Sequence, residues 1–196
     1  DSTGRSYTIE THNLPSARGQ GEPITGRISM PKGAVIETAV TGADDTKVLL
    51  ASDAGYGFLT SIADLSSKTK NGKAALTLSK NAQILTSQAL ESTDNKMLAA
   101  VTNEGRMLVF NVAELPELSK GKGNKIINIA TAKAASREEL LTSLVVFDAQ
   151  DTLLVHSGKQ HLRLKPADIA HFIGERGRRG NKLPRGYQRV DYIETV

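Results

Sequence analysis

The sequence predicts an all-β fold, a propeller-like domain of about four repeated blades with about four antiparallel strands each. One segment recurs four times along the 196 residues, and its turn glycines are spaced by 51, 50 and 53 residues: Gly4, Gly55, Gly105 and Gly158. Short apolar runs bounded by turn residues accompany the copies. About four strands per fifty residues is typical of propeller blades.

The predicted strands lie in pairs around the turn glycines. They cover Lys47–Ser52, Phe58–Ile62, Met97–Thr102, Arg106–Val112, Leu144–Phe147, Thr152–His156 and Gln160–Leu164. Each pair is expected to form a tight hairpin, because glycine readily adopts the positive φ that such turns need. Single helical turns are expected at residues 62–65 and 166–169, and the longest helix at Ala132–Leu141, too short to carry a fold.

We expect one domain over residues 1–196, with repeats at about 1–32, 33–80, 81–130 and 131–196. The chain opens without Met in the middle of a strand–turn pattern, which suggests a fragment whose ring of blades is open or incomplete. Residues Tyr187–Val196 either add a last strand to the first blade or trail off. There is no Cys and no apolar run near the ~20 residues of a membrane span, which excludes disulfides and Cys-ligated metals and argues against a transmembrane helix.

Basic residues are concentrated in four glycine-rich segments, one in each repeat. We call residues 15–32, 66–80, 118–133 and 176–189 basic loops 1 to 4; together they hold 17 of the 25 Lys and Arg residues and a single acid, Glu22. The rest of the chain carries 8 basic and 20 acidic residues, so the net charge of +4 conceals a segregated surface. Turns collect Lys, Gly and Asn in many proteins, but four such loops in register favour a functional surface.

Flexible cations and exposed backbone N–H groups on such loops suit phosphate contacts that do not read bases. Aromatic residues make up 4% of the chain and Trp is absent, which disfavours a platform for stacking single-stranded bases. Gly121–Lys125 and Gly177–Lys182 lack the spacing of a phosphate-binding P-loop. The acidic pairs Asp44–Asp45 and Glu138–Glu139 are expected in solvated turns or on helix faces. The expected ligand is therefore duplex DNA, contacted along its backbone.

Four longer segments carry a resemblance to a known family. They are Leu14–Pro23 (LPSARGQGEP), Ser52–Phe58 (SDAGYGF), Leu118–Asn128 (LSKGKGNKIIN) and Gly174–Gly180 (GERGRRG). In this order they resemble the C-terminal domain of the A subunit of bacterial DNA topoisomerase IV (ParC), within the gyrase A and ParC C-terminal β-pinwheel family. The resemblance covers essentially the whole chain.

The resemblance implies a β-pinwheel, whose neighbouring blades exchange strands, with an outer basic surface that binds and bends duplex DNA without sequence specificity. It implies a non-catalytic module of a type IIA topoisomerase that presents the transported DNA segment for decatenation and supercoil relaxation. The catalytic tyrosine, ATP and Mg²⁺ of the family enzyme belong to other domains or subunits. No catalytic residue, metal, cofactor or small-molecule substrate is therefore expected here.

The resemblance also implies partners and a location. The partners are duplex DNA, the remainder of the ParC subunit, and the ATPase subunit ParE, which is reached through ParC. The location is the bacterial cytoplasm at the nucleoid, with the full-length enzyme compatible with a peripheral place at the inner membrane. The alternative function is a propeller-type docking platform for a chromosome-condensing SMC complex, because segregated charge suits protein recruitment as well.

The related gyrase A protein carries a basic box, Gln-Arg-Arg-Gly-Gly-Lys-Gly, that no loop here reproduces; Ser119–Gly123 shares only its Gly-Lys-Gly end. This favours topoisomerase IV over gyrase, and bending over full wrapping. The expected DNA-binding residues all lie in the four basic loops. They are Arg18, Gly19, Gly21, Arg27, Lys68, Lys70, Lys73, Lys120, Lys122, Lys125, Arg176, Arg178, Arg179, Lys182 and Arg185.

Overall fold

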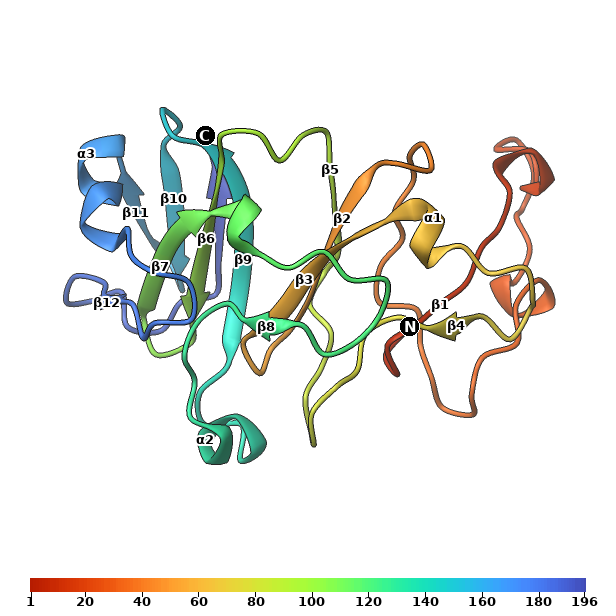
Figure 1. Ribbon diagram of the computed structural model, residues 1–196, viewed down its shortest axis with the longest axis horizontal. Coiled ribbons are helices and arrows are strands. Elements are labelled where there is room, and N and C mark those ends of the chain that lie inside the picture. Colours follow the sequence, from red (N-terminus) through yellow and green to blue (C-terminus); the bar gives the residue numbers. More distant parts are fainter.

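The computed structural model describes residues 1–196 and consists mainly of short antiparallel strands. Four sheets follow one another along the long axis, from the first at the right of Figure 1 to the fourth at the left. The first sheet pairs β1 (Arg5–Ser6) with β4 (Lys73–Ala74). The second sheet has the order β5 (Gln88–Leu90), β2 (Lys47–Ser52), β3 (Tyr56–Ser61) and β8 (Asn124–Lys125). The third sheet has the order β12 (Asn181–Lys182), β7 (Arg106–Asn111), β6 (Lys96–Thr102) and β9 (Leu141–Asp148). The fourth sheet has the order β11 (Gln160–Leu164), β10 (Leu153–Ser157) and β13 (Tyr192–Thr195). The predicted all-β, propeller-like fold is confirmed.

Three hairpins form the centre of the last three sheets, as the sequence predicts. They pair β2 with β3, β6 with β7, and β10 with β11. The turn glycines Gly55, Gly105 and Gly158 have φ values of 83°, 68° and 59°, and Gly4, just before β1, has a φ of 80°. All seven predicted strands are present, with bounds that differ by up to three residues.

Strands are exchanged between successive repeats. The short strands β4, β8 and β12 lie in basic loops 2, 3 and 4, and each pairs with the strand that follows the turn glycine of the preceding repeat. The register is the same in all three places, because the residue after the glycine faces its partner in the pairs Arg5↔Ala74, Tyr56↔Lys125 and Arg106↔Lys182. On the other side of the hairpins, β5 pairs with β2 and β9 with β6. The four-stranded sheets thus combine one hairpin with two strands from farther along the chain.

A glycine with positive φ precedes each of the exchanged basic strands. Gly123 has a φ of 76°, and a Cβ there would lie 2.3 Å from the carbonyl oxygen of Gly57; at Gly180, with φ 70°, it would lie 2.4 Å from that of Met107. A side chain at either position would therefore collide with the backbone that receives the strand. The basic loops contain glycine for strand docking as well as for turning.

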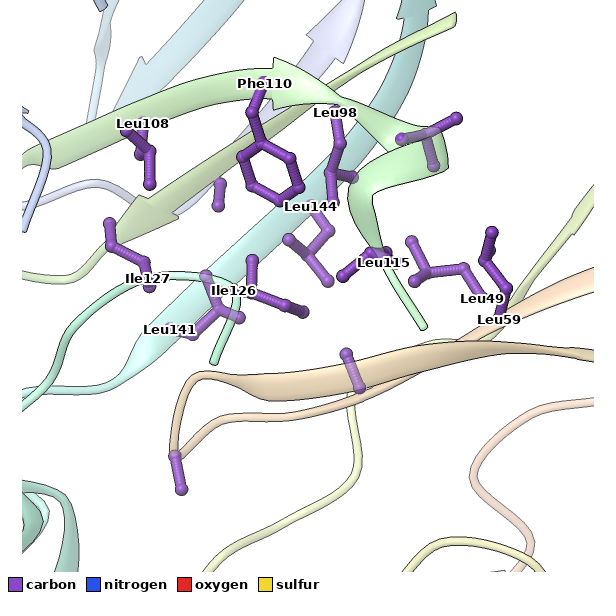
Figure 2. Close-up of a cluster of buried hydrophobic side chains, with 14 of the residues drawn as sticks. Leu49, Leu59, Leu98, Leu108, Phe110, Leu115, Ile126, Ile127, Leu141 and Leu144 are labelled. Atoms are coloured by element: carbon purple, nitrogen blue, oxygen red, sulfur yellow. The ribbon is translucent and has the colours of Figure 1, made fainter. Parts of the chain in front are cut away.

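The hydrophobic core lies between neighbouring sheets. A cluster of 17 buried residues joins the second and third sheets, with Leu49 and Leu59 facing Leu98 and Phe110 in Figure 2. A second cluster of 13 joins the third and fourth sheets. Because β6 and β7 are covered on both faces, they are apolar at successive positions and do not alternate.

The fourth sheet is the last one formed by residues 1–196. In β10, Leu153 and Val155 are buried while Leu154 and His156 are half-buried, so the strand alternates. The strand β13 pairs with β10, so the C-terminal residues complete the fourth sheet. Both expected alternatives for residues 187–196, a last strand for the first blade or a trailing end, are wrong. No strand pairing connects the first and fourth sheets, which lie at opposite ends in Figure 1, so residues 1–196 do not form a closed ring.

The helices are single turns. Those predicted at 62–65 and 166–169 are present as α1 (Ile62–Leu65) and α3 (Pro166–Ile169), and the remaining short turns are η1 (Thr11–Asn13), η2 (Ile24–Gly26), η3 (Val112–Glu114) and η4 (Ala170–Phe172). None of the helices has the length and apolar character needed to cross a bilayer.

The predicted helix at Ala132–Leu141 is wrong beyond its first turn. The observed helix, α2, covers only Thr131–Ala135. Arg137 then adopts a φ of 62°, which a right-handed helix does not allow. Farther on, the Leu140 N–H donates to the side chain of Asn103 (2.8 Å) and Leu141 enters β9. Tertiary contacts therefore override the local helical propensity.

Candidate nucleic-acid interface

The four basic loops are linked into one continuous band. Backbone hydrogen bonds join each loop to the next: Ser29 N–H to Lys70 O (2.8 Å), Gly121 N–H to Ala75 O (2.9 Å), Thr77 N–H to Gly121 O (2.8 Å), Gly177 N–H to Ile126 O (2.9 Å) and Asn128 N–H to Arg178 O (2.9 Å). Figure 1 shows the strands of three of these loops, β12, β8 and β4, in a row along the long axis. Strand exchange thus brings together cations that are about fifty residues apart in the sequence.

The residue after each of the first three turn glycines holds the basic loop of the next repeat. Arg5 donates to the carbonyl oxygens of Asn71 (2.8 Å) and Gly72 (3.0 Å). Arg106 donates to the carbonyl oxygen of Gly180 (3.1 Å). At the equivalent position Tyr56 lies beneath the ammonium group of Lys122, 3.8 Å from the ring centroid, which is a cation–π contact. These three anchors escaped the sequence analysis, although their place directly after the glycine is a signal that could have found them.

Loops 2 and 3 present the least engaged cations. Lys68, Lys70 and Lys120 are exposed, Lys73 is half-buried, and the side chains of all four make no hydrogen bond or ion pair within the chain. Lys122 is exposed and has only its contact with Tyr56. The half-buried Lys125 donates to the side-chain oxygen of Asn128 (2.8 Å). These ammonium groups can meet anions at little cost in broken contacts.

Loop 1 lies at the end of the band. Arg18, Gly19 and Gly21 are exposed, and the Arg18 side chain has no partner. Arg27 is paired with Glu22, the acid within the basic loops, through an Nε–H donation of 2.9 Å. Loop 1 therefore offers one free cation from the predicted set.

Loop 4 differs from the others, because most of its cations have partners within the protein. Arg176 donates to the carbonyl oxygen of Lys125 (2.8 Å), and Lys182 to that of Glu104 (2.8 Å). Arg178 pairs with Glu175 at 2.7 Å on the surface. Arg185 is exposed and has no side-chain partner.

Arg179 is bound to a buried carboxylate. Its Nη1 atom lies 2.5 Å from Oε1 of Glu139, whose side chain is 0% exposed, and it also donates to the carbonyl oxygen of Asn128 (2.9 Å). Its Nη2 atom lies 3.8 Å from Glu104. The expectation that Glu138–Glu139 lies in a solvated turn or on a helix face is therefore wrong for Glu139. The sequence gives no local sign of this buried ion pair, because Arg179 lies 40 positions away.

Acidic residues gather at the opposite ends of the hairpins. They precede the first strand of each hairpin or lie in the helical turn after the second: Asp44, Asp45, Asp64, Asp94, Glu114, Asp151 and Asp168. Figure 1 shows α1 and α3 on the side away from β4 and β12. At this acidic side, a hydrogen bond from Lys96 to Asp148 (2.7 Å) raises the pKa of the lysine above its ordinary value. The charge segregation seen in the sequence is thus a segregation in space.

An apolar cavity of about 450 Å³ lies beside the first sheet, lined by residues that include Ile9, Ile28 and Leu76. Two of its titratable lining groups bond to each other, since the Tyr7 hydroxyl donates to Asp1 (2.6 Å). Arg5 is held by the carbonyl oxygens of loop 2. The three titratable groups that line the cavity, Asp1, Arg5 and Tyr7, are therefore all engaged within the protein.

Comparisons with known proteins agree with this architecture. The family model described as DNA gyrase C-terminal domain, beta-propeller, matches residues 46–88 and 96–146. The chain is 53% identical over 193 residues to the A subunit of DNA topoisomerase 4 from Pseudomonas aeruginosa, and 50% identical over 194 residues to that from Escherichia coli. These alignments cover 98% and 99% of this chain but only 26% of each relative, so the chain spans about a quarter of their length.

Solved structures give the same result. The E. coli ParC C-terminal domain superposes with a TM-score of 0.92 at 50% identity, over 100% of this chain and 78% of that one. A DNA gyrase A C-terminal domain superposes with a TM-score of 0.73 at 16% identity, over 100% of this chain and 63% of that one, and shares the fold. The chain therefore belongs to the β-pinwheel family formed by the C-terminal domains of ParC, from DNA topoisomerase IV, and of DNA gyrase A.

Proposed function

We propose that this domain binds duplex DNA through its phosphates, without sequence specificity, along the band formed by the four basic loops. The observation that carries the proposal is the chain of backbone hydrogen bonds that joins the loops into one band. Lys and Arg groups spaced along such a band can replace condensed counterions on DNA. Because these cations contact phosphates and sugar edges, they position the duplex without reading its sequence.

The absence of the gyrase A basic box from all four loops favours bending and guiding of DNA rather than complete wrapping. We propose that the domain presents a bent duplex segment to the rest of a topoisomerase IV enzyme during decatenation and supercoil relaxation. In that role it has no catalytic residue, metal or cofactor of its own and acts with ParE and the remainder of ParC, at the nucleoid in the bacterial cytoplasm.

The proposal is tested by neutralising single lysines. Lys120→Gln removes a free cation from the band, and Lys165→Gln removes an exposed lysine from the acidic side, next to α3. If Lys120 binds a phosphate, Lys120→Gln makes the negative slope of log K against log salt less steep by about 0.9. Lys165→Gln leaves the slope unchanged. Equal slopes for the two variants and the wild type would contradict the proposed band.

A second candidate function is docking of an SMC-type chromosome-condensing complex. The observation that favours it is the acidic side of the domain, which suits a basic partner surface. Reversing the charges of Lys120, Lys122 and Lys125 separates the two functions. Loss of duplex binding with partner binding intact supports the DNA interface and leaves the acidic side as the docking surface. Loss of partner binding with duplex binding intact would place the docking surface on the basic band instead.

A further inference from the structure

The arginines of loop 4 are the densest cationic group in the sequence, yet the structure gives two of them a different task. Arg176 and Arg179 are half-buried and direct their guanidinium groups at the protein itself. The Nε atom of Arg176 is buried without a hydrogen-bond partner, so water does not reach that side of the group. Guanidinium groups in this state are poorly placed to meet a phosphate.

Both arginines hold one short segment of loop 3. Residues 125–128 receive the Arg176 side chain at the carbonyl oxygen of Lys125 (2.8 Å) and the Arg179 side chain at that of Asn128 (2.9 Å). Two backbone hydrogen bonds, from Gly177 to Ile126 and from Asn128 to Arg178, lie between them. The segment is thereby fixed at both ends as well as in its middle.

This segment sets the position of the free lysines of loop 3. It begins in β8, which follows Lys120 and Lys122 directly, and its Ile126 and Ile127 are buried in the core with 0% exposure. Lys125 is itself held by Asn128, within the same segment. A loose segment would allow these ammonium groups to spread over more conformations, which DNA binding would then have to restrict.

Glu139 keeps Arg179 in its place. Neither oxygen of this fully buried carboxylate accepts a hydrogen bond, so the guanidinium group 2.5 Å away is its one compensating partner. If Arg179 turned outward to a phosphate, it would leave an uncompensated charge inside the protein, which is strongly unfavourable. Arg179 therefore stays inside when DNA is bound.

We propose that Arg176 and Arg179 are positioning residues, which lock loop 4 onto loop 3 so that the free lysines of loops 2 and 3 contact the DNA phosphates. This inference rests on the proposed DNA-binding function. It divides the basic residues into two classes that charge alone does not distinguish. Lysines such as Lys68, Lys70 and Lys120 neutralise phosphates, and the two arginines reduce the disorder of the surface that carries them.

The test uses the full chain and a variant that leaves no buried charge unpaired, Arg179→Gln combined with Glu139→Gln. Its duplex affinity at fixed salt is expected to fall about two- to tenfold, the cost of ordering a loosened loop. The slope of log K against log salt is expected to stay at the wild-type value in this double variant, whereas Lys120→Gln makes the slope less steep by about 0.9. A merely structural role would leave the affinity of a folded variant unchanged.

Amide hydrogen exchange gives a readout that does not depend on DNA. Protection of the Asn128 and Gly177 amides, which bond across the two loops, is expected to fall in the double variant, while the amides of β10 keep theirs. The inference would be overturned by any of three results for the double variant: a salt slope as much less steep as that of Lys120→Gln, an unchanged affinity, or intact protection at both amides. If the wild type failed to bind duplex DNA at all, the proposed function would fall, and the exchange data would still decide whether the arginines position the segment.

Discussion

At the scale of single residues, one position serves the same purpose through different chemistry. The residue after the turn glycine is Arg5, Tyr56 or Arg106, and each holds the basic loop that arrives from the next repeat. The two arginines donate to backbone carbonyl oxygens, and the tyrosine offers its ring to an ammonium group. The position is constant because the register of strand exchange is constant.

The pair Arg179–Glu139 is expected to matter for stability. Arg179→Gln leaves Glu139 charged and buried, so we expect the free energy of unfolding to fall by about 3 kcal/mol. Urea unfolding measures this directly. Arg185→Gln is the matched control, because this arginine of the same loop is exposed and without partners, and its loss is expected to cost less than about 0.5 kcal/mol. Equal midpoints for the two variants would show that the buried pair is unimportant.

Residue roles in the candidate site could be predicted only in part. The phase of the charges along the sequence is sufficient to identify the basic loops, because glycine and lysine recur with each hairpin. It cannot separate Lys120, which is free, from Arg179, which is paired, because the partners Glu139 and Asn128 come from other parts of the chain. Long-range pairing of this kind leaves no local pattern in the sequence.

At the scale of elements, the exchanged strands connect the fold to the site. The strands β4, β8 and β12 are two residues long and each contains one lysine, so the sequence predicts loops at these positions. Their pairing becomes visible only in three dimensions, because each partner strand lies more than fifty residues earlier. The hairpin strands were predictable because their apolar runs are local. The helix at Ala132–Leu141 was overpredicted because the positive φ of Arg137 ends the helix and the Leu140 N–H bonds to Asn103, just before β9 begins at Leu141.

Two glycines with the same backbone conformation test the importance of strand docking. Gly180 has a φ of 70° and no room for a Cβ beside Met107, whereas Gly21 has a φ of 75° with open space around it. Gly21→Ala is expected to cost about 1 kcal/mol, for the positive φ alone. Gly180→Ala is expected to cost clearly more and to lower hydrogen-exchange protection in β12, because the strand must move away. The same unfolding free energy for both variants would mean that docking contributes little.

At the scale of the whole molecule, the repeats do not behave as separate units. The second and third sheets take strands from farther along the chain, and one cluster of 17 buried residues joins them. The hairpins therefore share both hydrogen bonds and core, and the basic band depends on the same pairings. The strand pairings that complete the sheets therefore also assemble the candidate interface.

The separation of charge also belongs to the whole molecule. The turn ends of the hairpins carry the basic band, and the open ends carry the acids that precede or follow the strands. The acids on the turn side are compensated, since Asp53 pairs with Arg137 (2.9 Å) and Glu104 with Lys133 (3.4 Å). A polyanion thus meets attraction on one side and repulsion on the other.

The central claim is that this one-sided band binds DNA by its phosphates. The most direct measurement is a salt titration of the wild-type domain with two duplexes of unrelated sequence. With roughly 6 phosphates contacted, log K should fall with log salt at a slope of about −5, an affinity loss on the order of a thousandfold between 50 and 200 mM salt. Both duplexes should give the same line. A flat salt dependence, or binding to one of the two sequences only, would contradict the account.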